Sequence, residues 1–147
     1  NFHARFSAKQ RHYIYKIVNR RAPLTIEREL AWVIHKNLNI TLMQDAAKYF
    51  IGKHDLNAFR SINCQSETSI KTIDDVTIQN QNQKISINVK AKSFLHSQVR
   101  IMVGTLVYVG MEKIEPQQIK LILKNTDRKE AGPTAPAHGL YLKSVFY

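Results

Sequence analysis

The chain has 147 residues, enough for about one domain with a buried core, and 44% of them are hydrophobic. No apolar run approaches the roughly 18 residues that a membrane span needs, and no signal-peptide pattern opens the chain. Its 22 Lys and Arg outnumber its 11 Asp and Glu, which gives a net charge of +11. Such an excess is typical of domains that bind nucleic acid, although a charge that only serves solubility produces the same composition.

The remaining composition narrows the possible sites. A single cysteine, Cys64, excludes a disulfide framework and a Cys-rich zinc site, and it fits a cytoplasmic protein. The six histidines lack the spacing of metal ligands, so we predict no metal. Because no linker or repeat divides the chain, residues 1–147 are predicted to form a single domain. The chain does not begin with Met, and we expect it to be a piece of a longer protein.

The first half predicts strands and one helix. The β-branched and aromatic residues 12–19 predict a strand, and residues 29–35 predict a shorter one. Residues 41–52 predict a helix, because Met43, Ala46, Ala47 and Phe50 follow helical spacing. In this interpretation Thr41 and Gln44 form a capping box, and Gly52 ends the helix.

The next segments predict a hairpin of two strands, residues 69–79 and 84–92, joined by a polar turn at residues 80–83. Residues 84–92 alternate strictly, with Ile85, Ile87, Val89 and Ala91 on one side. Lys90 and Lys92 lie on the other side with Lys84, so the strand should have one buried face and one basic face.

The last third predicts two helices and a closing strand. Residues 94–109 are apolar nearly all round, which predicts a buried helix, and residues 116–125 predict a short amphipathic one. A Pro- and Gly-rich loop over 131–139 then leads to a strand over 140–147. The order is β-α-β-β-α-β with an extra short helix. This order predicts a ferredoxin-like α+β fold, with an antiparallel sheet and helices on one face.

Arg100 is the unusual residue of the buried helix. It is the only charged residue between Lys92 and Glu112, with His96 as the only other side chain that titrates near neutral pH. The arginine could extend to the rim of the helix and keep its head in water. Alternatively, it could face a buried acid or phosphate, because a desolvated charge persists only when it is paired.

Aromatic and basic residues elsewhere are candidates for RNA contacts. Tyr13 and Tyr15 share one face of a predicted strand, where they could fill the core or form a stacking platform. Arg5 and Arg11 are among the basic residues interleaved with these aromatics, a pattern that suits an RNA surface. Phe59 and Arg60 follow the first helix, where they could provide a stacking and phosphate pair or simply anchor a loop. No glycine-rich phosphate loop, nucleophile elbow or zinc-protease motif is present.

Four stretches together resemble one enzyme family. They are "NFHARFSAKQRHYIY", "HDLNAFRSINCQS", "KAKSFLHSQVRIMVGTLVYVG" and "GPTAPAHGLYL". In order and spacing they are similar to the C-terminal half of TruA-type tRNA pseudouridine synthases, over essentially all 147 residues. The resemblance implies a cofactor-free homodimer of ferredoxin-like halves. Such a protein binds tRNA and isomerises uridines at positions 38–40 of the anticodon stem-loop.

The resemblance also implies roles for individual residues. Tyr13 would stack on a flipped uridine, Arg100 would pair with the catalytic Asp, and Leu140 would line the pocket. The expected RNA-binding residues are Arg5, Arg11, Phe59, Arg60, Lys90, Lys92 and His96. We therefore expect Arg100 at an open, apolar-walled cleft near Tyr13 and Leu140, without a strong carboxylate partner from its own chain.

The sequence also departs from the family pattern. The segment that carries the family's nucleophilic Asp has no match here, so this chain would be inactive alone. Leu56 stands where the family has Phe. Two alternatives to an enzyme half stay open: a non-catalytic RNA-binding module with a structural Arg100, and a homo-oligomerisation domain with incidental charge.

Overall fold

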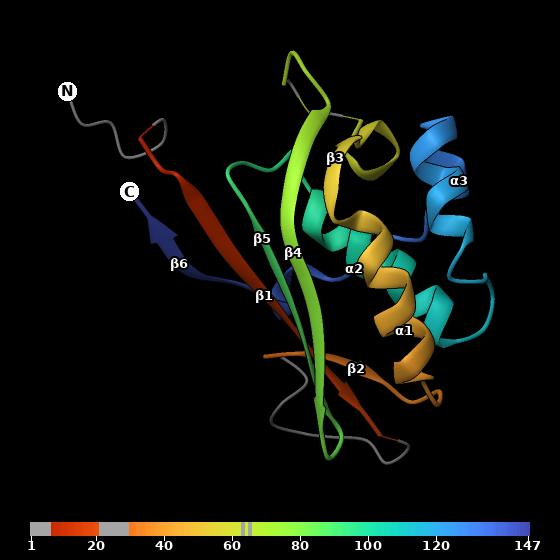
Figure 1. Cartoon of the computed structure of the whole chain (residues 1–147). Helices are drawn as coiled ribbons and strands as arrows, with labels where there is room; N and C mark the ends of the chain where they lie inside the picture. Colours follow the sequence, from red (N-terminus) through yellow and green to blue (C-terminus); the bar gives the residue numbers. More distant parts are fainter. Residues whose placement is uncertain (1–6, 21–29, 63, 65) are drawn as a thin grey trace.

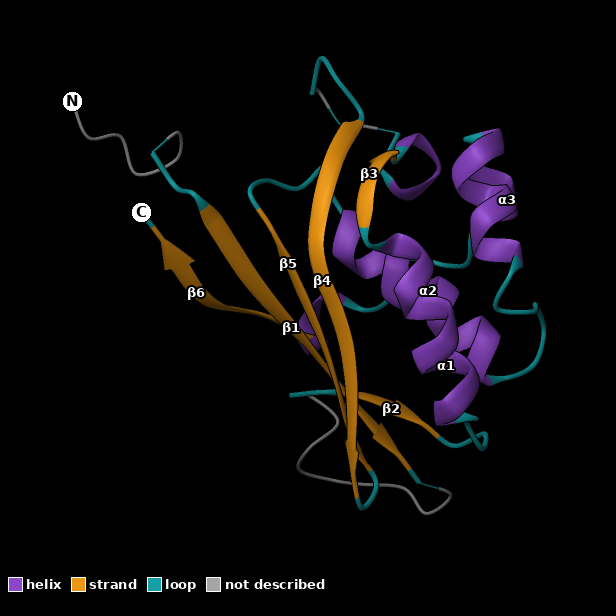
Figure 2. Ribbon diagram, viewed as in Figure 1, coloured by secondary structure: helices purple, strands orange, loops and turns teal. Residues whose placement is uncertain are grey.

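The computed structural model describes residues 7–20, 30–62, 64 and 66–147. A six-stranded sheet forms one layer, and three helices lie together on one of its faces (Figures 1 and 2). The strands are β1 (Gln10–Asn19), β2 (Trp32–Ile34), β3 (Gly52–Asp55), β4 (Ile70–Gln81), β5 (Lys84–Ala91) and β6 (Leu140–Phe146). The helices are α1 (Ile40–Ala47), α2 (Gln98–Gly110) and α3 (Gln118–Asn125).

The sheet has the topology that the sequence predicts. Strand β1 pairs antiparallel with β5 on one edge and with β6 on the other, and β5 pairs antiparallel with β4. The four strands β6-β1-β5-β4 therefore form the ferredoxin-like sheet, and the α+β prediction is confirmed. Two short strands extend it: β2 runs parallel to the end of β1, and β3 pairs with β4 at the far edge.

Alternation along the strands separates the two faces of the sheet. The predicted inward residues of β5 are at most 1% exposed and pack under the helices, as Tyr15 and Ile17 of β1 do. On the opposite face, the His12 ring nitrogen Nε2 lies 2.8 Å from Asn88 Oδ1, so this buried polar pair satisfies itself.

The first helical region differs from the prediction at both ends. Asn39, not Thr41, caps α1, because its side chain accepts a hydrogen bond from the Leu42 amide at 3.1 Å. Gln44 instead donates to the Ile78 carbonyl of β4, so the expected capping box is absent. The α-helix ends at Ala47, and a 3-10 turn continues to Phe50. Gly52, with a φ of 113°, then opens β3, a strand that the sequence did not reveal.

Helix α2 is buried as predicted, but it begins at Gln98 and not at Phe94. The buried Gln98 side chain accepts a hydrogen bond from the Leu95 amide, and Ser97 takes a left-handed φ of 64°. Residues 92–97 are therefore an ordered loop and not a first helical turn. Among the residues of α2, only Arg100 and Tyr108 are not buried. Within the described ranges, no helix is long and apolar enough to cross a membrane.

The Pro- and Gly-rich loop, residues 131–139, is fastened along α2. A Cβ at Gly104 would lie 1.7 Å from the Pro133 carbonyl oxygen, and one at Gly132 would lie 2.7 Å from the Thr105 backbone. The Gly132 amide donates to Thr105 Oγ1 at 2.8 Å. The two glycines thus allow the backbones of the helix and the loop to touch. This contact fixes the position of residues 135–140, which follow in the chain.

We predict that Gly104→Ala lowers the free energy of unfolding by about 4 kcal/mol or more, because the new methyl group meets backbone that cannot move aside. Gly110→Ala is the matched control. Its Cβ would meet the flexible Met43 side chain at 2.6 Å, so a loss of about 1–3 kcal/mol is expected. Urea unfolding of this chain, followed by fluorescence of its single tryptophan, Trp32, measures both. Equal losses in the two variants would contradict this account of the helix–loop contact.

Candidate active site

A pocket of about 400 Å³ opens where β1, the loop before α2 and the end of loop 131–139 meet. It is lined by Tyr13, Phe94, Leu95, His96, Ser97, Gln98, Val99, Arg100, Ala137 and Leu140. The structure thus brings Tyr13, Arg100 and Leu140 together, although they come from three distant parts of the chain. No acidic side chain is among these lining residues.

Arg100 enters the pocket from α2 and is held by the loop. Its Nε donates to the Ala135 carbonyl at 2.7 Å, and the Ala135 amide donates back to the Arg100 carbonyl at 3.0 Å. Among the residues that the structure describes, its guanidinium forms no ion pair with a carboxylate. Since Nε is occupied, the two terminal Nη groups remain available to an acceptor that enters the pocket.

The aromatic wall of the pocket is formed by Tyr13 and Phe94. Their ring centroids lie 5.2 Å apart at 86°, an edge-to-face contact that fixes the plane of the Tyr13 ring. Tyr13 is only partly buried, so one part of its ring remains accessible. Leu140, the first residue of β6, pairs with Tyr15 in register and adds an apolar wall. These side chains give the pocket aromatic and apolar walls.

Tyr15 and Tyr13, two residues apart on β1, differ in burial. Tyr15 lies on the same face of β1 as Tyr13 but is fully buried, and its ring meets that of Trp32 edge to face at 6.3 Å. Burial raises the pKa of its hydroxyl, an effect that the nearby Arg100 charge partly opposes. Of the two alternatives for this pair, Tyr15 fills the core and Tyr13 reaches the pocket.

Several predicted basic residues surround the pocket. His96 lines it and is exposed. The Ser61 amide donates to the His96 carbonyl at 3.0 Å, so Arg60 lies on a segment tied to this loop. Arg11 lies two residues before Tyr13 on the same strand face, and its guanidinium donates to the Lys92 carbonyl, where the loop begins. Arg60 and Arg11 are thus both connected to the loop that carries His96.

Three other predicted residues are not part of this arrangement. Phe59 is fully buried, with its ring 5.1 Å from that of Phe50. The expectation that it stacks on RNA is therefore wrong, and the alternative that it anchors the loop agrees with its packing. Lys90 pairs with His12 in register and lies on the sheet face opposite Tyr13. Arg5 falls outside the described residues.

Some pocket residues were not identified from the sequence. Phe94, Gln98 and Ala137 line the pocket, but two of them belonged to a predicted buried helix and one to a Pro-rich loop. The only local signal was the pair of polar residues Ser97 and Gln98, which interrupt the apolar run just before Arg100. A polar pair at that point is consistent with a helix start, which moves the preceding residues into a loop.

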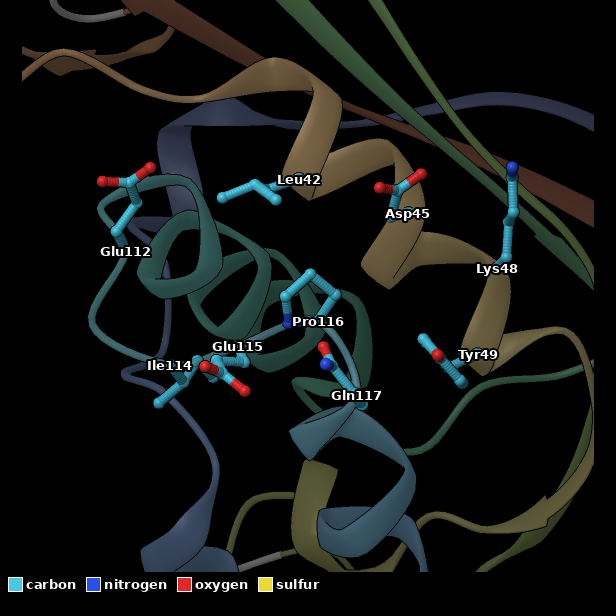
Figure 3. A pocket seen from close by; sticks show the side chains of 9 residues that line it. All are labelled: Leu42, Asp45, Lys48, Tyr49, Glu112, Ile114, Glu115, Pro116 and Gln117. Carbon is cyan, nitrogen blue, oxygen red and sulfur yellow. The ribbon is translucent and has the colours of Figure 1, made fainter.

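A larger hollow of about 900 Å³ lies between α1 and the connection from α2 to α3 (Figure 3). It contains none of the predicted site residues. Asp45, Glu112 and Glu115 line it with one basic residue, Lys48, and Glu112 and Lys48 lie at opposite ends of it. This negative lining does not suit a polyanion. No cluster of His, Cys, Asp and Glu able to hold a metal ion occurs in the described part of the chain.

Comparisons with known proteins connect this chain to one enzyme family. A sequence model of the tRNA pseudouridine synthases matches residues 46–147. The chain is 56% identical to tRNA pseudouridine synthase A of Ehrlichia chaffeensis and 54% identical to that of Anaplasma phagocytophilum, in each case over 99% of this chain. The enzyme of the same name from Parvibaculum lavamentivorans is 47% identical over 100% of the chain.

These alignments cover 60%, 59% and 60% of the three relatives, so the chain spans about three fifths of the length of the curated proteins that it matches. The matched region contains the α2 segment with Arg100 and the loop before β6 that delivers Leu140. Since the family match covers more than half of the chain, and the relatives' identity is high along all of it, the chain belongs to the tRNA pseudouridine synthase family.

Proposed function

We propose that this chain is the part of a tRNA pseudouridine synthase that holds the target uridine and orients the catalytic carboxylate. The nucleophilic Asp would come from the portion of the protein outside these residues. The observation that carries the proposal is one pocket that combines an accessible tyrosine ring, an apolar wall and an arginine with no carboxylate partner among the described residues. Tyr13 would stack on the base, and Leu140 would pack against its edge.

The proposed reaction is an isomerisation, so no atom is gained or lost. The bond between N1 of uracil and C1′ of ribose breaks, the base rotates, and a bond from C5 to C1′ forms. A proton leaves C5, and N1 gains one. The target nucleotide must leave the helical stack to expose both positions, which suits a slot lined by aromatic and apolar side chains.

Arg100 would keep the carboxylate ionised and aimed at the sugar. A guanidinium lowers the pKa of a carboxyl group beside it, and the effect is strong in a site from which water is largely excluded. With Nε bound to Ala135, the carboxylate would approach end-on and accept hydrogen bonds from the two Nη groups. This geometry would fix both the position and the direction of the acid.

The tRNA substrate would be held by the basic residues around the pocket, His96, Arg60, Arg11 and Lys92, with Lys90 contributing from the other sheet face. Positive charge supplies most of the affinity for a nucleic-acid backbone. The likeness to TruA-type enzymes supports the anticodon stem-loop, positions 38–40, as the target and a homodimer as the active form. Sedimentation of the full-length protein tests the homodimer.

In the full-length protein, Arg100→Lys should reduce the single-turnover rate of pseudouridine formation about 100-fold, and Arg100→Ala should reduce it further. A lysine cannot bond Ala135 and also present two parallel donors to a carboxylate. Arg128→Lys is the matched control, because Arg128 also donates to a carbonyl of this loop, that of Gly132, but does not line the pocket. Its rate should stay within about threefold of the parent. If Arg100→Ala converts tRNA as fast as the parent, the role of Arg100 is wrong.

The basic residues near the pocket should contribute to binding through phosphate contacts. Replacement of both Arg60 and Lys92 by Ala should reduce the slope of log affinity for tRNA against log salt by about 1–2. Lys120 and Lys124 on α3 provide the control pair, because both are exposed and neither lines the pocket. Filter binding across a salt series measures the slopes. An unchanged slope in the first double variant, or an equal change in both, would refute the proposed contacts.

A further inference from the structure

The hydroxyl group of Tyr15 has a specific partner next to the pocket. The tyrosine is completely buried in the core, yet its hydroxyl donates to the Pro136 carbonyl at 2.6 Å. Pro136 immediately precedes the 3-10 turn Ala137–Gly139, which leads into Leu140. A phenylalanine would fill the same space in the core, so the hydroxyl is the part of the side chain that packing does not explain.

Tyr15 also contacts the other end of this turn. A Cβ at Gly139 would lie 2.6 Å from Cζ of the Tyr15 ring and 2.8 Å from its oxygen, so the glycine allows the backbone to rest directly on the ring. One side chain therefore holds both ends of the turn, by a hydrogen bond at Pro136 and by close packing at Gly139. The pocket residues Ala137 and Leu140 are placed by this contact.

The same segment determines the direction of the arginine. Ala135, which precedes Pro136, accepts the hydrogen bond from Arg100 Nε and donates one to the Arg100 carbonyl. The Ala135 and Pro136 carbonyls belong to successive planar peptide groups that meet at the Pro136 Cα. Because the proline ring fixes φ there, only one rotation separates the two groups, and a shift of the Pro136 carbonyl would displace the Ala135 peptide group. The Nε bond would then lengthen or tilt, and the two Nη groups would point elsewhere.

We propose that Tyr15 is a positioning residue: by holding Pro136 and Gly139, it fixes the Ala135 carbonyl and thereby aims the Arg100 guanidinium at its carboxylate partner. This inference rests on the proposed function of Arg100. It assigns the two tyrosines of β1 separate tasks, because Tyr13 faces the substrate and Tyr15 acts only through the loop and Arg100. Positional errors of an ångström at a reacting group reduce rates substantially even when binding is unchanged.

The test compares Tyr15→Phe with Tyr141→Phe in the full-length protein. Tyr141 is the matched control, because its hydroxyl also donates to a backbone carbonyl, that of Leu30, at 2.7 Å, and it does not line the pocket. Three quantities are measured for each variant: the single-turnover rate at saturating enzyme, the dissociation constant for tRNA, and the thermal midpoint. Rates are taken well below both midpoints, so that only folded protein contributes.

Tyr15→Phe should reduce the single-turnover rate about tenfold and leave the dissociation constant within about twofold. Tyr141→Phe should leave both unchanged. The inference is overturned if Tyr15→Phe reacts within twofold of the parent, if its loss lies in tRNA affinity, or if both variants slow equally. Arg100→Ala, measured in parallel, separates the two claims: if it is inactive and Tyr15→Phe is not impaired, the proposed function survives and the positioning role fails.

A second pair of variants tests the anchor from the other end of the loop, should Tyr15→Phe not accumulate as folded protein. Thr105→Val removes the oxygen that accepts the Gly132 amide, and Thr105→Ser retains it. Thr105→Val should slow the single-turnover step with tRNA affinity unchanged, and Thr105→Ser should restore the parental rate to within about threefold. If the Val variant is as fast as the Ser variant, fastening of the loop does not control the reaction and the inference fails.

Discussion

The paired hydrogen bonds between Arg100 and Ala135 are the contact on which the rest of the site depends. They join a buried helix to the loop that leads into the last strand. The Arg100 side chain donates to the Ala135 carbonyl, and the Ala135 amide donates to the Arg100 carbonyl. Without this contact, the guanidinium would have no fixed direction in a region of apolar side chains. With it, the loop satisfies one donor of the arginine and leaves the other donors at the pocket.

Much of the surrounding packing supports this contact. Gly104 and Gly132 let the loop lie against the helix backbone, and the ferredoxin-like sheet brings β1 and β6 side by side beneath it. The residues that meet at the pocket are far apart in the sequence, so the pocket exists only when the sheet has formed. A rigid support of this kind is what a site needs when the position of one charge decides the chemistry.

A fully buried arginine without an acidic partner would normally destabilise the folded state, because a desolvated charge is costly unless it is paired. Here the guanidinium is only partly buried and faces an opening, so water can reach it in this chain. In the enzyme that we propose, the acid would come from outside these residues. The full site would then assemble only when both parts of the protein come together.

The sequence predicted the fold better than it predicted local boundaries. The strict alternation in β5 and the apolar run of α2 predicted these elements correctly, because burial of one face, or of a whole helix, leaves a recognisable spacing of apolar residues. The strand β3 and the start of α2 were missed, since the first is set by pairing with β4 and the second by the Gln98 side chain. The role of Phe59 was also mispredicted for this reason: its burial against Phe50 depends on the tertiary structure, which the local sequence does not reveal. The family resemblance predicted that Arg100 lies at the pocket. The hydrogen bond that holds it to Ala135 could be found only from the structure.

The most direct test of this account is a crystal structure of the full-length protein at a resolution that defines the Arg100 side chain. We expect an aspartate carboxylate from outside these residues within about 3 Å of both Nη groups, with Nε still bound to the Ala135 carbonyl. Arg100 paired with an acid of its own chain, or an open pocket with no carboxylate from the rest of the protein near its Nη groups, would contradict it.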